Sequence, residues 1–531
     1  ITHPNHKTRK LSRTGHTSWS LTEVEFTNGP FLDTNTSTTT LTASGVSGSV
    51  TITASSSTFV STDVGRQVRI GSGHSKITAF GSATSVTVTT TTNFPNTNAS
   101  TDWSLGAFST TTGHPSCVSF FEQRLVFAGT TDEPQTLYFS KAGDYENMTS
   151  GTNADDAMVY TIASNQVNRI RYLKSVRTLI VGTTGGEFTV SADGTDAAVT
   201  PTNIVIKKQS SYGTANVDAI PAGNSILFLQ KAKRKIRELS YNFDTDGYVA
   251  PDLTILNDIV TKSGINEMAY QQEPDSILWC VRDDGVLAGL TYQRSENVVA
   301  WHRHKLGGTF GTGSSATGFG VVESVASISG ELTEDELYVI VKRTINGATK
   351  RYVEVFAPFD FDETLSTDFR FLDSHLTYSG GATTTLSGLS HLEGQVVSIL
   401  ADGATHADKT VSSGSITLDR SVTSAVVGLK YDSVLQTMRI EGGAAEGTSQ
   451  GKTKRISKVV LRLFETVGVK VGPSLAQLET VPFRTTSSQM NNPVDTLLAG
   501  DKEIEFRDDY NTDGFIFVKQ DQPLPLSVLA L

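Results

Sequence analysis

The chain has few sulfur-containing residues, and cysteine is the one that forms the disulfides and metal sites of small secreted or metal-bound domains. Its 531 residues include only two cysteines and five methionines. Cys117 and Cys280 both lie in apolar runs, which indicates buried thiols rather than a disulfide framework. The low cysteine content favours synthesis in a reducing cytoplasm.

Long hydrophobic runs, helical periodicity and an excess of basic residues are also lacking. No apolar run approaches the roughly 20 residues of a membrane-spanning helix, and no signal peptide is recognisable. The formal net charge is −11. A general nucleic-acid-binding surface needs Lys and Arg to displace phosphate counterions, so the charge argues against that class of protein.

What the sequence does contain is a phrase that recurs between residues 115 and 358. Each copy is a short apolar run, a turn, and a second run in which apolar and polar residues alternate, which predicts a β-hairpin. The copies return after roughly fifty residues, the period of a propeller blade. Their aligned apolar positions are Leu125, Leu179, Ile226, Ile277 and Leu337, and the second runs begin at Thr136, Gly186, Lys235, Val286 and Arg351.

The apolar face of such a hairpin cannot be buried alone, so neighbouring copies are expected to stack around an axis. We therefore predict an all-β fold: a β-propeller core with small inserted β modules, barrel-like or sandwich-like, and a β-rich terminal platform. A β-sandwich with coincidental spacing is the alternative. The predicted domains are an N-terminal platform or propeller entry segment (1–35), an inserted small β module (36–107), the propeller core (108–358), a second small β module (359–435) and a C-terminal β-rich platform (436–531).

The two inserted modules are predicted from changes in composition. Residues 36–107 are rich in Thr and Ser with alternating Val, as in Ser49-Val-Thr-Ile-Thr, which favours an antiparallel sheet over a disordered linker. In the second module, Asp402-Gly403 lies between two apolar runs and predicts a tight hairpin.

Histidines offer few candidates for metal binding. His302 and His304 would share one face of a strand, but no nearby carboxylate or cysteine completes a site, so a packed or exposed structural pair is favoured over a metal centre. His3 and His6 are no better placed. Asp244-Thr-Asp-Gly resembles the start of a calcium loop but lacks the Glu at the twelfth position, so a turn is favoured.

Catalytic motifs are equally sparse. Asp360, Asp362 and Glu363 form the densest acidic group, but one acidic turn does not provide two carboxylates across a cleft, so a solvated loop is favoured. The Thr184-Gly185-Gly186 turn lacks the Lys and the helix of a phosphate-binding loop and is interpreted as a hairpin turn. No Gly-x-Ser-x-Gly elbow stands out. We predict no enzyme activity, no cofactor and no metal site.

One basic patch is a candidate for partner docking. Lys452, Lys454, Arg455 and Lys458 lie close together at the start of a predicted strand, Lys452 to Phe464. They are interpreted either as a docking surface for an acidic partner or as the solvated edge of that strand.

Several phrases spread over nearly the whole chain resemble the tail nozzle, or tail tubular protein B, family of short-tailed bacteriophages. The small module around Val64-Gly-Arg-Gln-Val-Arg-Ile is also similar to a β insert that recurs in such phage proteins. The phrases that carry the resemblance are Thr2-His-Pro-Asn-His, Arg9-Lys-Leu-Ser-Arg-Thr, Arg124-Leu-Val-Phe-Ala-Gly-Thr, Tyr138-Phe-Ser-Lys-Ala-Gly-Asp-Tyr, Gly185-Gly-Glu-Phe, Ile236-Arg-Glu-Leu, Ala300-Trp-His-Arg-His, Gly451-Lys-Thr-Lys-Arg-Ile-Ser-Lys-Val and Asp521-Gln-Pro-Leu-Pro-Leu.

The resemblance implies a structural protein of the virion, assembled in the host cytoplasm and placed in the phage tail. Its subunits, expected to form a hexameric ring, would attach below a tail adaptor and form the distal channel for DNA ejection. Further implied partners are tail fibres or spikes, the host envelope at infection, and genomic DNA that passes without sequence-specific binding. Family members have a further region before the phrase at Thr2, and the first residue is Ile1, so a processed or partial chain is expected.

Two other classes of function remain open from the sequence. One is a propeller-type tail depolymerase or glycosidase, for which Asp360 and Asp362 would be the carboxylates to test. The other is a receptor-binding adhesin, which should bind cells or glycans as an isolated protein.

Overall fold

A computed structural model describes the chain except for residues 195–196, 331–333, 359–366, 368, 445–446 and 484–496. The described residues form strands and short 3-10 helices and contain no α-helix, so the predicted all-β fold is confirmed. The chain divides into two compact units, Ile1–Met268 and Ala269–Leu531.

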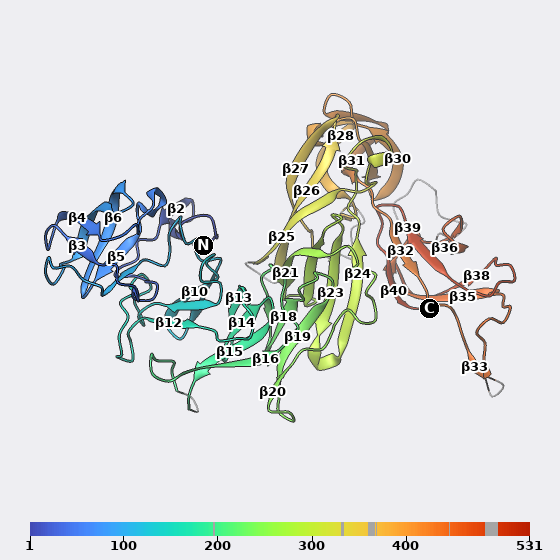
Figure 1. Cartoon of the computed structure of the whole chain (residues 1–531). Helices are drawn as coiled ribbons and strands as arrows, with labels where there is room; N and C mark the ends of the chain where they lie inside the picture. The colour runs from blue at the N-terminus through green and yellow to red at the C-terminus, as the bar shows by residue number, and fades with distance from the viewer. Residues whose placement is uncertain (195–196, 331–333, 359–366, 368, 445–446, 484–496) are drawn as a thin grey trace. The chain divides into compact units, whose positions relative to one another are not determined.

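Unit 1 begins with an exposed hairpin and a six-stranded antiparallel sheet (Figure 1). The sheet buries alternate residues, such as Val50 and Ile52, against Phe59 and Val88, because successive side chains of a strand point to opposite faces. It lies within residues 36–107. The elements are β1 (Arg9–Gly15) and β2 (Ser18–Glu23), then β3 (Leu41–Ala43), β4 (Ser49–Ala54), η1 (Ser61–Asp63), β5 (Gln67–Ile70), β6 (Gly73–Ser82), β7 (Ser85–Thr92) and β8 (Trp103–Leu105).

Three four-stranded antiparallel sheets follow in unit 1, each built from strands consecutive in the sequence. The second strands of the second and third sheets are buried along their length, and β10 of the first sheet is buried except at Leu125, which is half-buried; this burial explains the apolar runs of the repeated phrase. The first sheet holds β9 (Cys117–Phe121), β10 (Arg124–Ala128), β11 (Thr136–Phe139) and β12 (Met158–Thr161). The second holds β13 (Ile170–Ser175), β14 (Leu179–Thr183), β15 (Gly186–Ala192) and β16 (Ile204–Ser210). The third holds β17 (Ile220–Ala222), β18 (Ser225–Leu229), β19 (Ile236–Asn242) and β20 (Gly247–Val249).

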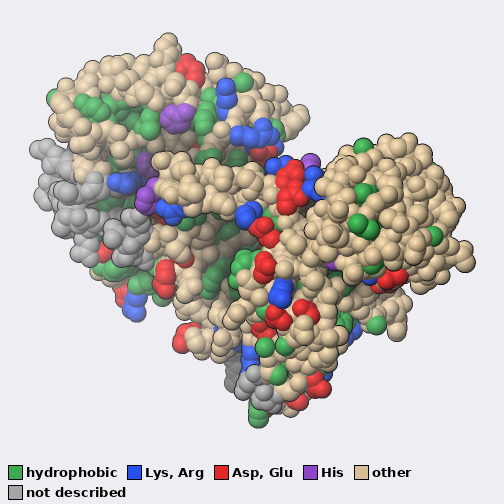
Figure 2. All heavy atoms as spheres, turned by 90° about the vertical axis from the view of Figure 1, so that its left-hand side faces the viewer, with side chains coloured by type: hydrophobic (Ala, Val, Ile, Leu, Met, Phe, Trp, Pro, Cys, Tyr) green, Lys and Arg blue, Asp and Glu red, His purple; other side chains and the backbone are tan. Residues whose placement is uncertain are grey.

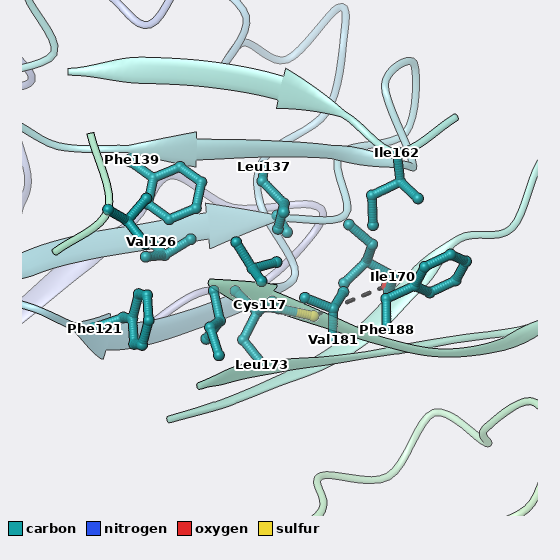
Figure 3. Close-up of a cluster of buried hydrophobic side chains, with 14 of the residues drawn as sticks. Cys117, Phe121, Val126, Leu137, Phe139, Ile162, Ile170, Leu173, Val181 and Phe188 are labelled. Carbon is teal, nitrogen blue, oxygen red and sulfur yellow. Dashed lines mark hydrogen bonds between the residues drawn. The ribbon is translucent and has the colours of Figure 1, made fainter. Parts of the chain in front are cut away.

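Neighbouring sheets of unit 1 stack face to face through apolar clusters. Figure 3 shows Val126 and Leu137 of the first sheet packed against Leu173 and Val181 of the second. Cys117 lies in this cluster, and burial raises the pKa of its thiol to about 11. A second cluster joins the second sheet to the third. The thiols of both cysteines are free and buried, as predicted.

Unit 2 continues the same pattern with a four-stranded and a three-stranded antiparallel sheet. These two sheets also share one apolar cluster, which includes Trp279, Leu287 and Val339. The strands are β21 (Ile265–Gln271, which begins just before the unit boundary), β22 (Ile277–Arg282), β23 (Leu287–Gln293) and β24 (Val298–His304), then β25 (Val321–Ser329), β26 (Asp335–Ile345) and β27 (Ala348–Val355), with η2 (Arg294–Glu296) and η3 (Gly313–Ser315) between strands.

The rest of unit 2 is a four-stranded module with its own core and a group of small C-terminal sheets. The module holds β28 (Asp373–Ser387), η5 (Ser390–Leu392), β29 (Val396–Ala401), β30 (Ala404–Thr410) and β31 (Ser415–Leu429). The C-terminal strands are β32 (Ser433–Gln436), β33 (Gly443–Ala444), β34 (Gly447–Thr448), β35 (Lys458–Thr466), β36 (Lys470–Ser474), β37 (Gln477–Thr480), β38 (Leu498–Glu505), β39 (Phe517–Gln520) and β40 (Ser527–Ala530).

The hairpins predicted from the repeated phrase are all present. Strand β10 pairs with β11, β14 with β15, β18 with β19, β22 with β23, and β26 with β27, each antiparallel. The Asp402-Gly403 hairpin is confirmed as well, with Asp402 at φ 47° and Gly403 at φ 73° between β29 and β30. Closure of the stacked sheets around one axis stays a prediction.

One predicted strand begins later than expected. The prediction ran from Lys452, but β35 starts at Lys458. Before that point the chain makes a turn in which the Lys452 amide donates to the Ser449 carbonyl, 3.1 Å. Lys454 then forms an isolated bridge with Asn511. These local hydrogen bonds satisfy the backbone outside the ladder.

Candidate interaction surfaces

The described part of the chain contains no group of three or more His, Cys, Asp or Glu side chains arranged to hold a metal ion. Among the same residues no helix is long and apolar enough to cross a membrane. The acidic turn Asp360, Asp362 and Glu363 lies outside the described residues.

The histidine pair of β24 is packed against aromatic side chains. His302 Nδ1 and His304 Nε2 lie 2.7 Å apart, and both rings contact Trp279. Burial lowers the pKa of His302, and burial with the neighbouring His302 lowers the pKa of His304 to about 4. Both rings are therefore neutral at physiological pH. The sequence favoured a packed or exposed structural pair, and the structure shows the packed arrangement.

The other turns singled out in the sequence are hairpin turns. Asp244-Thr-Asp-Gly joins β19 to β20, and Tyr241 donates its hydroxyl to Asp246 Oδ1 at 2.7 Å. Thr184 and Gly185 join β14 to β15. At the N-terminus, His3 and His6 form an isolated bridge with their rings 4.9 Å apart.

Glu187 follows the glycine turn and is fully buried in β15. Desolvation raises the pKa of its carboxyl, although the Ser210 hydroxyl and the Tyr212 backbone N–H lower it. Glu187 is therefore a packed side chain of the sheet.

The predicted basic patch lies beside carboxylates rather than forming a uniform positive surface. Arg455 Nε donates to the Asp508 carbonyl at 3.0 Å, and its guanidinium lies over the Tyr510 ring. Lys458 pairs with Glu503 across the β35–β38 ladder. Lys454 Nζ donates to the Ile440 carbonyl at 2.8 Å. Lys452 is exposed. The four side chains lie near one another along the chain, but three of them have local partners.

A groove of about 990 Å³ runs beside this patch and is lined by both signs of charge. Arg455, Lys458 and Arg507 lie along it, and so do Glu503, Glu505 and Asp508. On the face of the molecule that Figure 2 presents, acidic and basic side chains are also interspersed. A groove of mixed charge favours a polar protein partner over a uniformly acidic one.

Sequence reasoning missed a denser basic segment in unit 1. Lys231, Lys233, Arg234 and Lys235 occupy the turn between β18 and β19. The run Lys-Ala-Lys-Arg-Lys in the sequence was the signal that could have identified it.

The carboxyl group of Asp373, at the start of β28, has a strongly shifted pKa. Desolvation raises its pKa to about 6, although the Gly307 N–H donates to Oδ2 at 2.6 Å and Arg343 is nearby. The folded pKa lies above the ordinary value of 3.8, so folding favours the protonated form. The stability that this group contributes is present below about pH 4 and is lost as the pH rises through about 6.

We expect Asp373→Asn to remove this pH dependence while its amide oxygen still accepts from Gly307. Between about pH 4 and pH 7, the stability of wild type relative to the variant should fall by about 2 kcal/mol, measured by urea unfolding. Asp419→Asn is the control of opposite sign, because Lys409 lowers the pKa of the Asp419 carboxyl. Parallel pH profiles of wild type and Asp373→Asn would contradict the expectation.

No protein-family model and no curated protein matches the sequence. Among solved structures, an auxiliary nutrient binding protein from Bacteroides thetaiotaomicron shares 11% identity at a TM-score of 0.25, over 63% of this chain and 87% of that one. A second auxiliary nutrient binding protein, from Bacteroides ovatus, shares 10% identity at a TM-score of 0.26, over 60% of this chain and 86% of that one. A luciferin-regenerating enzyme shares 12% at a TM-score of 0.18, over 43% and 83%. Likenesses this weak carry no argument about function.

Proposed function

We propose that this chain is a structural virion protein, the tail nozzle of a short-tailed phage. In this proposal its subunits form a hexameric ring at the distal end of the tail channel, below the adaptor and next to the fibres or spikes. Genomic DNA passes through the ring without sequence-specific binding. The chain acts by assembly and has no catalytic role.

The observation that carries the proposal is where the phrases of the resemblance lie. Most of them lie in or beside strands of the sheets, and the phrase 451–459 also contributes Arg455 and Lys458 to the groove of mixed charge. Arg124 begins one phrase, and its guanidinium donates to the carbonyl of Ser140 in another, at 2.8 Å. The Gly143 amide donates to the carbonyl of Gln123, the residue before Arg124, at 2.9 Å, and β10 pairs with β11, so the two phrases contact each other within one sheet. Because the residues that resemble the tail nozzle family make contacts of this kind, the resemblance favours a shared structural framework over a shared catalytic site.

The charge of the chain also supports a conduit. A channel for DNA must let the phosphate backbone slide, and a surface rich in Lys and Arg would bind it by releasing counterions. The net charge of −11 opposes such binding.

The test is the particle mass of the purified full chain, measured by light scattering with negative-stain images of the same peak. We expect a closed ring of about six subunits with a central hole. If the chain alone is monomeric, the measurement is repeated with the tail adaptor of the phage that encodes it. An elongated trimer, or a chain that stays monomeric with the adaptor, would overturn the proposal.

A further inference from the structure

The basic turn of unit 1 places four cationic side chains within five residues. Lys231, Arg234 and Lys235 are exposed, and Lys233 is half-buried. Lys235 pairs with Asp252 at 2.8 Å, whereas no ion pair within the described residues involves Lys231 or Arg234. These two side chains are free to bind an external anion.

An aliphatic loop lies at the same end of the third sheet. After β20 the chain runs back along β19 to the start of that strand, where Arg237 and Asp252 form an isolated bridge. The next residues expose three aliphatic side chains, Ile255 at 73%, Leu256 at 99% and Ile259 at 68%. Exposure of several large aliphatic side chains on one short loop marks an interaction site.

Hydrogen bonds tie this loop to the basic turn on both sides. Before the loop, the Leu253 amide donates to the Ile236 carbonyl at 2.9 Å. After it, the Thr261 hydroxyl donates to the Arg234 carbonyl at 2.6 Å, and the Ile265 amide to that of Lys233 at 2.9 Å. Thr254, Val260 and Thr261 are buried and anchor the loop. Turn and loop therefore form one surface, called here the 231–262 surface.

We propose that the 231–262 surface docks onto a lipid bilayer that contains anionic phospholipids. The aliphatic side chains of Ile255, Leu256 and Ile259 enter the boundary between headgroups and acyl chains. The Lys and Arg side chains, with Lys262 beside them, bind the phosphate groups. This inference goes beyond the channel role and does not depend on it.

The local charge fits an anionic bilayer. Residues 231–235 and 252–267 carry five basic side chains against three acidic ones, in a chain whose net charge is −11. The acidic residues are Asp252, which is paired with Lys235, together with Asp258 and Glu267. A basic cluster beside exposed aliphatic residues is the combination by which peripheral proteins bind anionic membranes.

The same features disfavour other occupants. Nucleic acid would use the cations, but the three aliphatic side chains offer neither stacking nor hydrogen bonds to bases. A second copy bound through a two-fold axis would bring one basic turn against another. A bilayer uses both parts of the surface at once.

The test is co-sedimentation of the full chain with phosphatidylcholine vesicles, with and without phosphatidylglycerol. We expect binding only to the vesicles that contain phosphatidylglycerol, and weaker binding as salt is raised. The variants Ile255→Ser/Leu256→Ser/Ile259→Ser and Lys231→Glu/Arg234→Glu should each weaken binding by about tenfold or more.

Matched controls lie elsewhere in unit 1. Phe243→Ser changes an 87% exposed side chain in the hairpin at the other end of the same sheet, and Lys207→Glu/Lys208→Glu reverses two exposed charges on β16. Both control variants should bind as wild type does.

Insertion of the aliphatic loop into the bilayer can be measured directly with a dye at position 256. Cys117 and Cys280 are buried, so an environment-sensitive dye can be attached selectively to Leu256→Cys. Its emission should shift to the blue with phosphatidylglycerol vesicles, and that of a dye on Phe243→Cys should not. No binding to these vesicles, or equal loss in the controls, would overturn the proposal. The proposal would also be overturned if the test variants left lipid binding unchanged and instead abolished binding to duplex DNA. The same holds if they left lipid binding unchanged and instead abolished a change in oligomer mass.

Discussion

Replacing Arg124 with methionine is expected to destabilise unit 1 by about 4 kcal/mol. The Arg124 side chain is 2% exposed, and its guanidinium donates to the backbone carbonyls of Ser140, Ala154 and Asp156 at 2.6 to 2.8 Å. Methionine fills much of the same volume but donates no hydrogen bond, so three carbonyl oxygens lose their partner. Each such loss costs about 1–3 kcal/mol.

The measurement is the free energy of unfolding of the full chain in urea, followed by a probe in unit 1. Arg124→Lys should fall between wild type and Arg124→Met, because an ammonium group cannot reach all three carbonyls. Lys207→Met removes an exposed charge from β16 and should change stability by no more than about 0.5 kcal/mol. A loss below about 1 kcal/mol in Arg124→Met would show that the loop can satisfy these carbonyls with water.

The role of Arg124 illustrates what the sequence could and could not predict. The apolar run after Arg124 identified β10 and its partner β11, because central strands of stacked sheets are buried on both faces. The sequence offered no sign that Arg124 itself is buried, since an arginine before a strand is usually solvated. Its partners are backbone carbonyls of the segment 140–156, which any residue supplies.

The outer strands of the sheets were harder to predict for a related reason. Strand β16 is only partly buried and ends in Lys207-Lys-Gln-Ser, so it has neither a continuous apolar run nor a clean alternation. Its position is set by pairing with β15, a contact between distant residues. Local patterns indicate which segments can pair, whereas the edges of each sheet depend on tertiary contacts.

The candidate sites show the same division. Residue types alone favoured turns at Asp244 and Gly185, and the structure has hairpin turns there. For His302 and His304 they favoured a packed or exposed structural pair over a metal centre, and only the structure shows that the pair is packed. The 231–262 surface could not be predicted as a whole, because its two halves are separated in the sequence. Only the return of the chain along β19 brings them together.

The second large effect is expected at the ion pair between β26 and β27. Arg343 is 0% exposed, donates from Nε to the Gly307 carbonyl at 2.8 Å, and donates from Nη2 to Glu354 Oε2 at 3.1 Å. Removing one partner leaves the other charge buried without compensation. Arg343→Leu and Glu354→Leu should each destabilise unit 2 by about 3–5 kcal/mol.

The double variant Arg343→Leu/Glu354→Leu is expected to be much less destabilised than the sum of the two single variants. It buries no charge, and its remaining deficit is chiefly the Gly307 carbonyl, which loses its donor at a cost of about 1–3 kcal/mol. The double-mutant cycle, measured by urea unfolding, should therefore give a coupling of about 3 kcal/mol or more. Additive losses would mean that each charge reaches solvent when its partner is removed.

The pair also acts on Asp373, which gives the cycle an independent readout. Arg343 lowers the pKa of the Asp373 carboxyl and Glu354 raises it, while desolvation is the largest influence. Arg343→Leu should therefore move the pH-dependent loss of stability to higher pH, and Glu354→Leu should move it to lower pH. A variant that only perturbed packing would lower stability equally at every pH, so the direction of the shift separates an electrostatic role from a steric one.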